Sequence, residues 1–182
     1  MAAAAIRFKG PASYVADLAR SRAFYEGLLG FTVARVMRRD GAEIAIAYTA
    51  GFAIWQAADA YWSLTGDATA APARLGQGNW ENTFETGAAE AIHDRLVAAG
   101  AAFVHPWRTL PWGQRGFRVR DPDGHTLDIS ESHGAAVRRL VAEGESSATI
   151  AERMSVTESQ IAEFLAGAES TSCRATASST HP

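Results

Sequence analysis

A histidine, two arginines and several tryptophans are the side chains of this sequence best suited to chemistry or ligand binding. His105 ends an expected strand, 102–105, just before a loop that contains Trp112 and Arg115. A histidine titrates near neutral pH, so His105 suits a general base or a metal ligand, whereas a structural histidine would hydrogen-bond a loop carbonyl. Its place at an expected cavity mouth supports a catalytic role, and both roles stay open.

The arginines and tryptophans also admit two roles each. Arg118 alternates with Phe117 and Val119, which have the character of buried strand residues. One of the two arginines, Arg115 or Arg118, could bind a substrate carboxylate or phosphate. The alternative role is a salt bridge on the outer face of the sheet. The chain has five tryptophans. They pack in a core or dimer interface, or they form a stacking surface for a flat ligand.

These residues lie on two similar parts of the chain, and each part reads as a strand, a helix and three further strands. Val15 corresponds to Thr86 at an offset of 71, and Gly51 corresponds to Gly124 at an offset of 73. A nearly constant offset indicates a repeat, and each copy is too small to bury its sheet alone. The expected modules are 8–58 and 79–132, with helices at 18–29 and 88–99, each ended by a glycine, and a linker at 59–78.

After the second module the composition changes. Residues 133–168 have helical patterns and predict a helical appendage, and residues 169–182 have the composition of a disordered tail. The run 149–161 has the rhythm of a helix-turn-helix, but its second helix carries Glu158 and Glu163 and no lysine or arginine. This favours a helical appendage that packs on the barrel or on a partner subunit over a DNA-binding element.

The composition sets further limits. A net charge of −3 does not indicate a basic surface for nucleic acid. The sequence contains no stretch of about 18 apolar residues, the length that a membrane-spanning helix needs. The single cysteine, Cys173, excludes an internal disulfide. No segment resembles a secretion signal, so we expect a cytoplasmic protein without nucleic-acid or membrane partners.

Short motifs connect the chain to a known family. They are Val15-Ala16-Asp17, Leu29-Gly30-Phe31 and Asp121-Pro122-Asp123-Gly124 followed by Leu127-Asp128. With these motifs the chain resembles the vicinal oxygen chelate superfamily, which contains glyoxalase I, bleomycin-resistance proteins, fosfomycin-resistance enzymes and extradiol dioxygenases. The resemblance covers Phe8 to Glu131. A narrower resemblance, to a glyoxalase-like subgroup with a C-terminal helical tail, rests on Pro111-Trp112-Gly113-Gln114-Arg115.

The resemblance implies an α+β fold in which the βαβββ modules form a cupped, incomplete barrel. In that family a divalent metal can bind to residues of the first and last strands, and the matching positions here are Gly10, Trp55, Glu81 and Asp128. Glycine has no ligating side chain and tryptophan offers only an N–H donor. Glu81 and Asp128 remain, which suits a weak site for Mn²⁺, Mg²⁺, Ni²⁺ or Zn²⁺. A one-residue change of strand register would turn Gln56 inward instead of Trp55.

Two functional hypotheses follow from the resemblance. In the first, the chain is a lyase or isomerase whose metal lies on Glu81 and Asp128, while Glu81 or His105 moves a proton. In the second, it is a metal-free protein that binds a small molecule such as an antibiotic between tryptophans. The substrate-binding candidates are Trp55, Gln56, Trp112 and Arg115. Because the open sheet edges favour pairing with a second copy, we also expect a homodimer.

Overall fold

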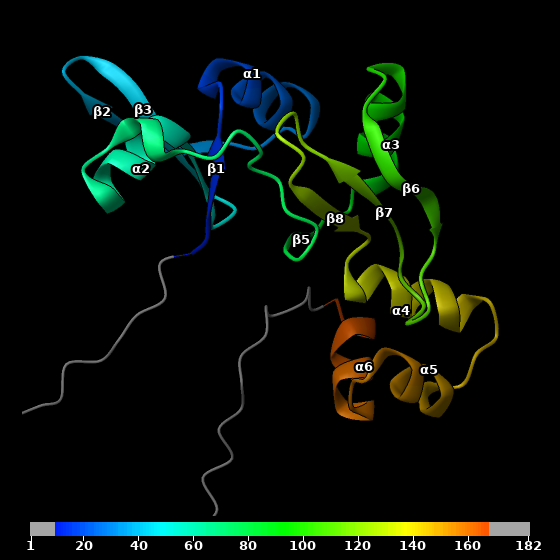
Figure 1. Cartoon of the computed structure of the whole chain (residues 1–182). Coiled ribbons are helices and arrows are strands. Elements are labelled where there is room, and N and C mark those ends of the chain that lie inside the picture. The colour runs from blue at the N-terminus through cyan, green and yellow to red at the C-terminus, as the bar shows by residue number, and fades with distance from the viewer. Residues whose placement is uncertain (1–9, 168–182) are drawn as a thin grey trace, which may run out of the picture. The chain divides into compact units, whose positions relative to one another are not determined.

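A computed structural model gives the structure of residues 10–167 (Figure 1). The tail expected at 169–182 lies outside these described residues. The chain divides into two compact units, and each is described by itself. Within the described range, the first unit comprises residues 10–83, Ala91–Pro106 and Arg118–Asp128. The second comprises Phe84–Glu90, Trp107–Phe117 and residues 129–167.

The first module has the expected strand, helix and three strands. They are β1 (Ala12–Val15), α1 (Leu18–Arg22) continued by a π-helical turn (Ala23–Leu28), β2 (Val33–Arg39), β3 (Ala42–Tyr48) and β4 (Ala53–Gln56). The sheet order is β1-β4-β3-β2, with β1 parallel to β4 and the other pairs antiparallel. Asp17 caps α1, since its side chain accepts a hydrogen bond from the backbone N of Arg20.

The second module repeats this order. It consists of β5 (Glu81–Glu85), α3 (Ala89–Ala98), β6 (Ala102–Thr109), β7 (Arg115–Arg120) and β8 (Thr126–Ser130). Its sheet order, β5-β8-β7-β6, matches that of the first sheet strand by strand. The predicted α+β fold of paired βαβββ modules is confirmed.

The expected linker, 59–78, contains regular structure that the sequence interpretation did not include. Helix α2 (Ala57–Thr65) follows β4 directly, and a short 3₁₀ helix (Ala68–Ala70) comes after it. Alanine is a strong helix former, and Gly66 ends α2 in the left-handed conformation at φ 80°. The alanine-rich composition at the start of this segment was therefore a helix signal as well as a linker signal.

Buried aromatic rings form much of the core of the first unit. Tyr25 is fully buried and contacts the rings of Phe31, Tyr48 and Phe52. Its hydroxyl donates to Asp121 Oδ2 at 2.9 Å. This bond ties the helical segment of the first module to the turn before β8.

The second unit contains the predicted helical appendage: α4 (His133–Ala142), α5 (Ser147–Met154) and α6 (Glu158–Leu165). A serine or threonine side chain caps the start of each helix. The helices bury a common apolar cluster made of Ala136, Val137, Leu140, Ile150, Met154, Ile161 and Phe164. Within residues 10–167, no helix is long and apolar enough to cross a bilayer.

Candidate functional site

The two carboxylates predicted to bind a metal meet at one arginine. Arg118 on β7 donates from Nε to Glu81 Oε2 at 2.7 Å and from its terminal NH2 to Glu81 Oε1 at 3.1 Å. The same NH2 group donates to Asp128 Oδ2 at 2.9 Å. The sheet order explains the convergence, because β8, which carries Asp128, lies between β5 and β7. Glu81 and Asp128 therefore share a cation that belongs to the chain itself.

His105 completes this cluster, which we call the Arg118 cluster: Glu81, His105, Arg118 and Asp128. Its Nε2 lies 3.3 Å from Arg118 Nη1, and its Nδ1 lies 3.0 Å from the carbonyl oxygen of Pro106. Because the guanidinium group and the carbonyl fix the roles of the two ring nitrogens, Nδ1 donates and Nε2 accepts. A neutral imidazole satisfies both contacts.

The two carboxylates lie in different electrostatic surroundings. Hydrogen bonds from Arg118 hold the pKa of Glu81 below its usual value. Burial raises the pKa of Asp128, although the charge of Arg118 opposes this shift. Oδ1 of Asp128 is buried and has no hydrogen-bond partner among the described residues. The guanidinium group therefore compensates Glu81 more fully than Asp128.

The residues at the predicted metal position do not fit a divalent ion well. Within residues 10–167, no three His, Cys, Asp or Glu side chains are arranged to hold a metal. Gly10 has φ 102°, and a Cβ there would lie 2.0 Å from the carbonyl oxygen of Gly51, so this position cannot supply a ligand without a shift of backbone. Arg118 already takes three of the four carboxylate oxygens that a metal could use.

Trp55 and Gln56 lie on opposite faces of β4. Trp55 pairs with Tyr14 of β1, and the two rings meet edge to face with centroids 6.1 Å apart. The Gln56 side chain accepts from the backbone N of Leu18 at 3.1 Å and donates to the carbonyl oxygen of Ala16 at 2.6 Å. Gln56 thus fastens the start of α1, and Trp55 shares a face with Tyr14.

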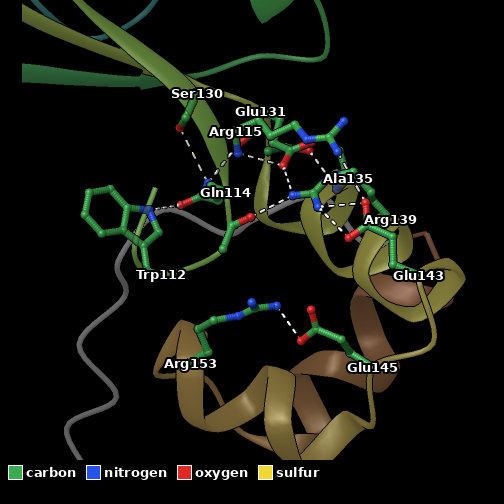
Figure 2. A network of polar contacts seen from close by, with 12 residues as sticks. Trp112, Gln114, Arg115, Ser130, Glu131, Ala135, Arg139, Glu143, Glu145 and Arg153 are labelled. Atoms are coloured by element: carbon green, nitrogen blue, oxygen red, sulfur yellow. Dashed lines mark hydrogen bonds and ion pairs between the residues drawn. The ribbon is translucent and has the colours of Figure 1, made fainter. Parts of the chain in front are cut away.

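Trp112 and Arg115 belong to the second unit, where both have structural contacts (Figure 2). Trp112 Nε1 donates to Gln114 Oε1 at 2.8 Å. The Arg115 backbone N donates to Glu131 Oε1 at 2.8 Å, and its guanidinium group lies 3.3 Å from Glu143 Oε1.

Arg139 on α4 organises the same region. It donates to Glu131 Oε1 at 2.6 Å, to Glu143 Oε2 at 3.2 Å and to the carbonyl oxygen of Gly113 at 2.6 Å. We call Gly113, Glu131, Arg139 and Glu143 the Arg139 cluster. In Figure 2 the Arg139 side chain lies between Glu131 and Glu143. It joins the helical appendage to the loop before β7.

The first unit has an open cavity of about 390 Å³ that is rich in aromatic side chains, and we call it the aromatic cavity. Tyr14 comes from β1 and Tyr61 from α2, and their rings meet edge to face at 5.9 Å. Trp80 lies just before β5 and is 62% exposed. The lining residues are Pro11, Ala12, Ser13, Tyr14, Tyr61, Pro72, Arg74, Leu75, Gln77, Asn79, Trp80 and His125.

Of these lining residues, sequence analysis considered only Trp80, as one of the five tryptophans that could form a stacking surface. His125 Nε2 lies 2.7 Å from the Tyr14 carbonyl oxygen, and the residue also lines the aromatic cavity. Tyr61 and Arg74 fell in the expected linker. One available signal was Arg74 itself, the only charged residue between Asp67 and Glu81.

A second, smaller cavity adjoins the Arg118 cluster. Its volume is about 290 Å³, and its lining includes Glu81, Thr126, Asn79 and Trp80. Asn79 and Trp80 also line the aromatic cavity. The segment before β5 therefore borders both cavities.

Comparisons with known proteins agree with this fold. A protein of unknown function from Agrobacterium tumefaciens str. C58 is 29% identical, with a TM-score of 0.60 over 71% of this chain and 96% of that one. A glyoxalase-related enzyme from Fulvimarina pelagi is 24% identical, with a TM-score of 0.52 over 69% of this chain and 88% of that one. A hypothetical protein from S. aureus is 17% identical, with a TM-score of 0.54 over 70% and 95% of the two chains.

Among curated proteins, none matches the chain significantly. The family model of the Glyoxalase/Bleomycin resistance protein/Dioxygenase superfamily matches residues 8–129, about two thirds of the sequence. This range spans both βαβββ modules and ends before the helical appendage. The chain belongs to the Glyoxalase/Bleomycin resistance protein/Dioxygenase superfamily.

Proposed function

We propose that this protein binds a small, flat organic molecule in the aromatic cavity and needs no metal ion to do so. The observation that carries the proposal is the cavity itself. Its volume of about 390 Å³ lies in the range of small-molecule sites, and aromatic rings with a few polar groups are the usual lining of such sites.

The arrangement of the rings supports a planar ligand. Tyr14 and Tyr61 contact each other, so the shape of that wall is fixed by packing. Trp80 is largely exposed to water, although an indole gains free energy when it is covered. A flat ligand that packs on Trp80 would bury this indole, which no side chain of the free protein covers fully.

The Arg118 cluster supports the part of the proposal that concerns the metal, namely that ligand binding does not require one. A metal on Glu81 and Asp128 would have to displace a guanidinium group that makes three hydrogen bonds to their oxygens. Charge-assisted bonds of this kind are among the stronger polar contacts in proteins. In this proposal Glu81 and His105 hold Arg118 in place and transfer no proton. The metal-dependent lyase or isomerase is the competing hypothesis.

The proposal is tested by titrating the protein with 2-naphthol and 2-naphthoate in the presence of EDTA, with calorimetric detection. We expect saturable binding of at least one compound. Trp80→Ala should weaken that binding about tenfold, since an aromatic contact contributes about 1 kcal/mol beyond burial. Trp62→Ala is the matched control: Trp62 is a comparably exposed indole, at 51%, and it does not line the cavity.

Two results would overturn the proposal. One is no binding of either compound. The other is binding that appears only when a divalent metal replaces EDTA and disappears in Asp128→Asn, which would support the metal-dependent enzyme instead.

We also propose a homodimer. Each four-stranded sheet has two outer strands, β1 and β2 in one and β5 and β6 in the other, and such edges favour pairing. Sedimentation equilibrium at micromolar concentration should give twice the mass of the chain, and a monomer would contradict this expectation.

A further inference from the structure

The aromatic cavity is positively charged in a protein whose net charge is −3. Among residues 10–167, no aspartate or glutamate lines the cavity, whereas Arg74 does. The polar lining side chains include a serine, a glutamine and an asparagine, all of which have hydrogen-bond donors. A cavity with one cation and no acidic group favours an anion over a neutral or cationic ligand.

The Arg74 side chain lacks a carboxylate partner within the part of the chain that the structure describes. Among residues 10–167, no ion pair includes Arg74, whereas Arg20, which lies near it around a neighbouring cavity, pairs with Asp123 at 2.7 Å. Arg74 is exposed and borders both the aromatic cavity and the neighbouring cavity that Arg20 also lines. Its guanidinium charge is therefore available to a ligand.

The backbone around Arg74 is held in place although its side chain reaches solvent. The Arg74 carbonyl oxygen accepts from Gln77 Nε2 at 3.2 Å. Two residues on, the Gly76 backbone N donates to the carbonyl oxygen of Asp123 at 3.0 Å. A Cβ on Gly76 would lie 2.4 Å from the carbonyl oxygen of Gly124, so only glycine allows this close approach. The segment is fixed against the turn before β8.

The Ser13 hydroxyl adds a second donor to the lining. Its oxygen accepts from Asn82 Nδ2 at 3.2 Å, which leaves the hydroxyl hydrogen to donate. Arg74 comes from the linker and Ser13 from β1, so donors approach the cavity from two segments.

We infer that the ligand of the aromatic cavity is an aromatic carboxylate, whose ring packs on Tyr14, Tyr61 and Trp80 and whose carboxylate pairs with Arg74. The inference rests on the proposed function and adds the charge of the ligand. An arginine matches the two oxygens of a carboxylate, and a bond to a charged group is stronger than a neutral one.

The test compares 2-naphthoate with 2-naphthamide, which has the same ring and shape but no charge. Both are titrated calorimetrically into the full chain in EDTA buffer. We expect the wild-type protein to bind naphthoate about tenfold more tightly than naphthamide, as one screened charge-assisted bond would give. In Arg74→Gln this preference should fall to about twofold or less, with the affinity for naphthamide unchanged.

Arg35→Gln is the matched control. It removes the same charge from an exposed arginine on β2 that does not line the aromatic cavity and lies near Met37 Sδ. Its preference for naphthoate should remain that of the wild type. This separates a contact with Arg74 from a change in overall charge.

Each outcome decides between the two claims. Equal affinity of the wild type for both compounds overturns the anion inference and leaves the proposed function intact. A preference that survives Arg74→Gln also overturns the inference, because the charge is then recognised elsewhere. If neither compound binds, the proposed function falls and the inference falls with it.

Discussion

Among the arginines that each hold two carboxylates, the one on β7 and the one on α4 lie in different surroundings. Arg118 pairs with Glu81 and Asp128, and Arg139 pairs with Glu131 and Glu143. The two guanidinium side chains are similarly covered, at 20% and 16% exposure. Arg139 also binds a loop carbonyl and joins a helix to that loop. The Arg118 cluster adjoins a cavity and leaves one Asp128 oxygen without a partner.

The difference shows that the same ion-pair chemistry has two uses in one chain. In the Arg139 cluster every contact positions secondary structure, so the cluster is part of the fold. In the Arg118 cluster the arginine neutralises carboxylates at the positions where the resemblance implies metal ligands. The role of a charge cluster therefore has to be inferred from its surroundings, here the secondary structure that it joins or the cavity that it adjoins.

The largest expected effect is on the stability of the second unit. Arg139→Ala removes the shared partner of Glu131, Glu143 and the Gly113 carbonyl, and we expect the free energy of unfolding to fall by about 3 kcal/mol. Arg115→Ala, the control, removes a pair with Glu143 that is 43–44% exposed and should cost less than about 0.5 kcal/mol. Urea denaturation measures both, and equal losses would contradict the structural role of Arg139.

A smaller effect concerns the loop that Arg139 holds. Gly113 has φ 96°, and a Cβ there would lie 3.2 Å from both Arg153 Nε and Leu140 Cδ1. Gly113→Ala should therefore lose about 1–2 kcal/mol through backbone strain and crowding. Gly144→Ala is the control, because Gly144 has a similar φ of 92° but open space around it. If both substitutions cost the same, crowding by α4 and α5 contributes nothing.

The smallest effect is a dependence on pH within the Arg118 cluster. The pKa of Asp128 is raised by burial, so its contribution to stability is present below about pH 3.9 and is lost as pH rises through its folded pKa. Asp128→Asn should consequently raise the free energy of unfolding at pH 7, by less than about 1 kcal/mol. This gain should vanish near pH 4.

Glu81 should behave in the opposite sense. Its pKa is lowered by Arg118, so its contribution is present above about pH 4.3 and is lost as pH falls through its folded pKa. Glu81→Gln should cost about 0.5 kcal/mol at neutral pH, a small loss because the side chain is 38% exposed. Thermal melts of both variants between pH 3.5 and 7.5 test these two predictions. Changes in melting temperature of the same sign at neutral pH would contradict them.

The fold could be predicted from the sequence because the two modules are repeats whose equivalent residues are separated by a nearly constant offset. The correspondence of Gly51 with Gly124 located equivalent turns, and both sheets have the same strand order. The helix α2 was missed because an alanine-rich run suits a linker as well as a helix.

The candidate sites were less predictable. Glu81 and Asp128 were singled out through the resemblance, but their partner was not recognised, because Arg118 reaches them only through a strand order that links β5, β8 and β7. The aromatic cavity draws residues from β1, α2 and the linker, and no periodicity relates these segments. Side-chain convergence of this kind depends on tertiary structure.

The proposal that Arg118 takes the place of a metal ion is tested most directly by Mn²⁺ titration of the wild type and Arg118→Met, with free Mn²⁺ followed by electron paramagnetic resonance. We predict no saturable binding to the wild type up to about 1 mM. Arg118→Met should release the two carboxylates and bind Mn²⁺ with a dissociation constant on the order of 10⁻⁴ to 10⁻³ M, as for a site with few protein ligands. Adding Asp128→Asn should abolish this gain. Saturable binding to the wild type that is lost in Glu81→Ala would contradict the account.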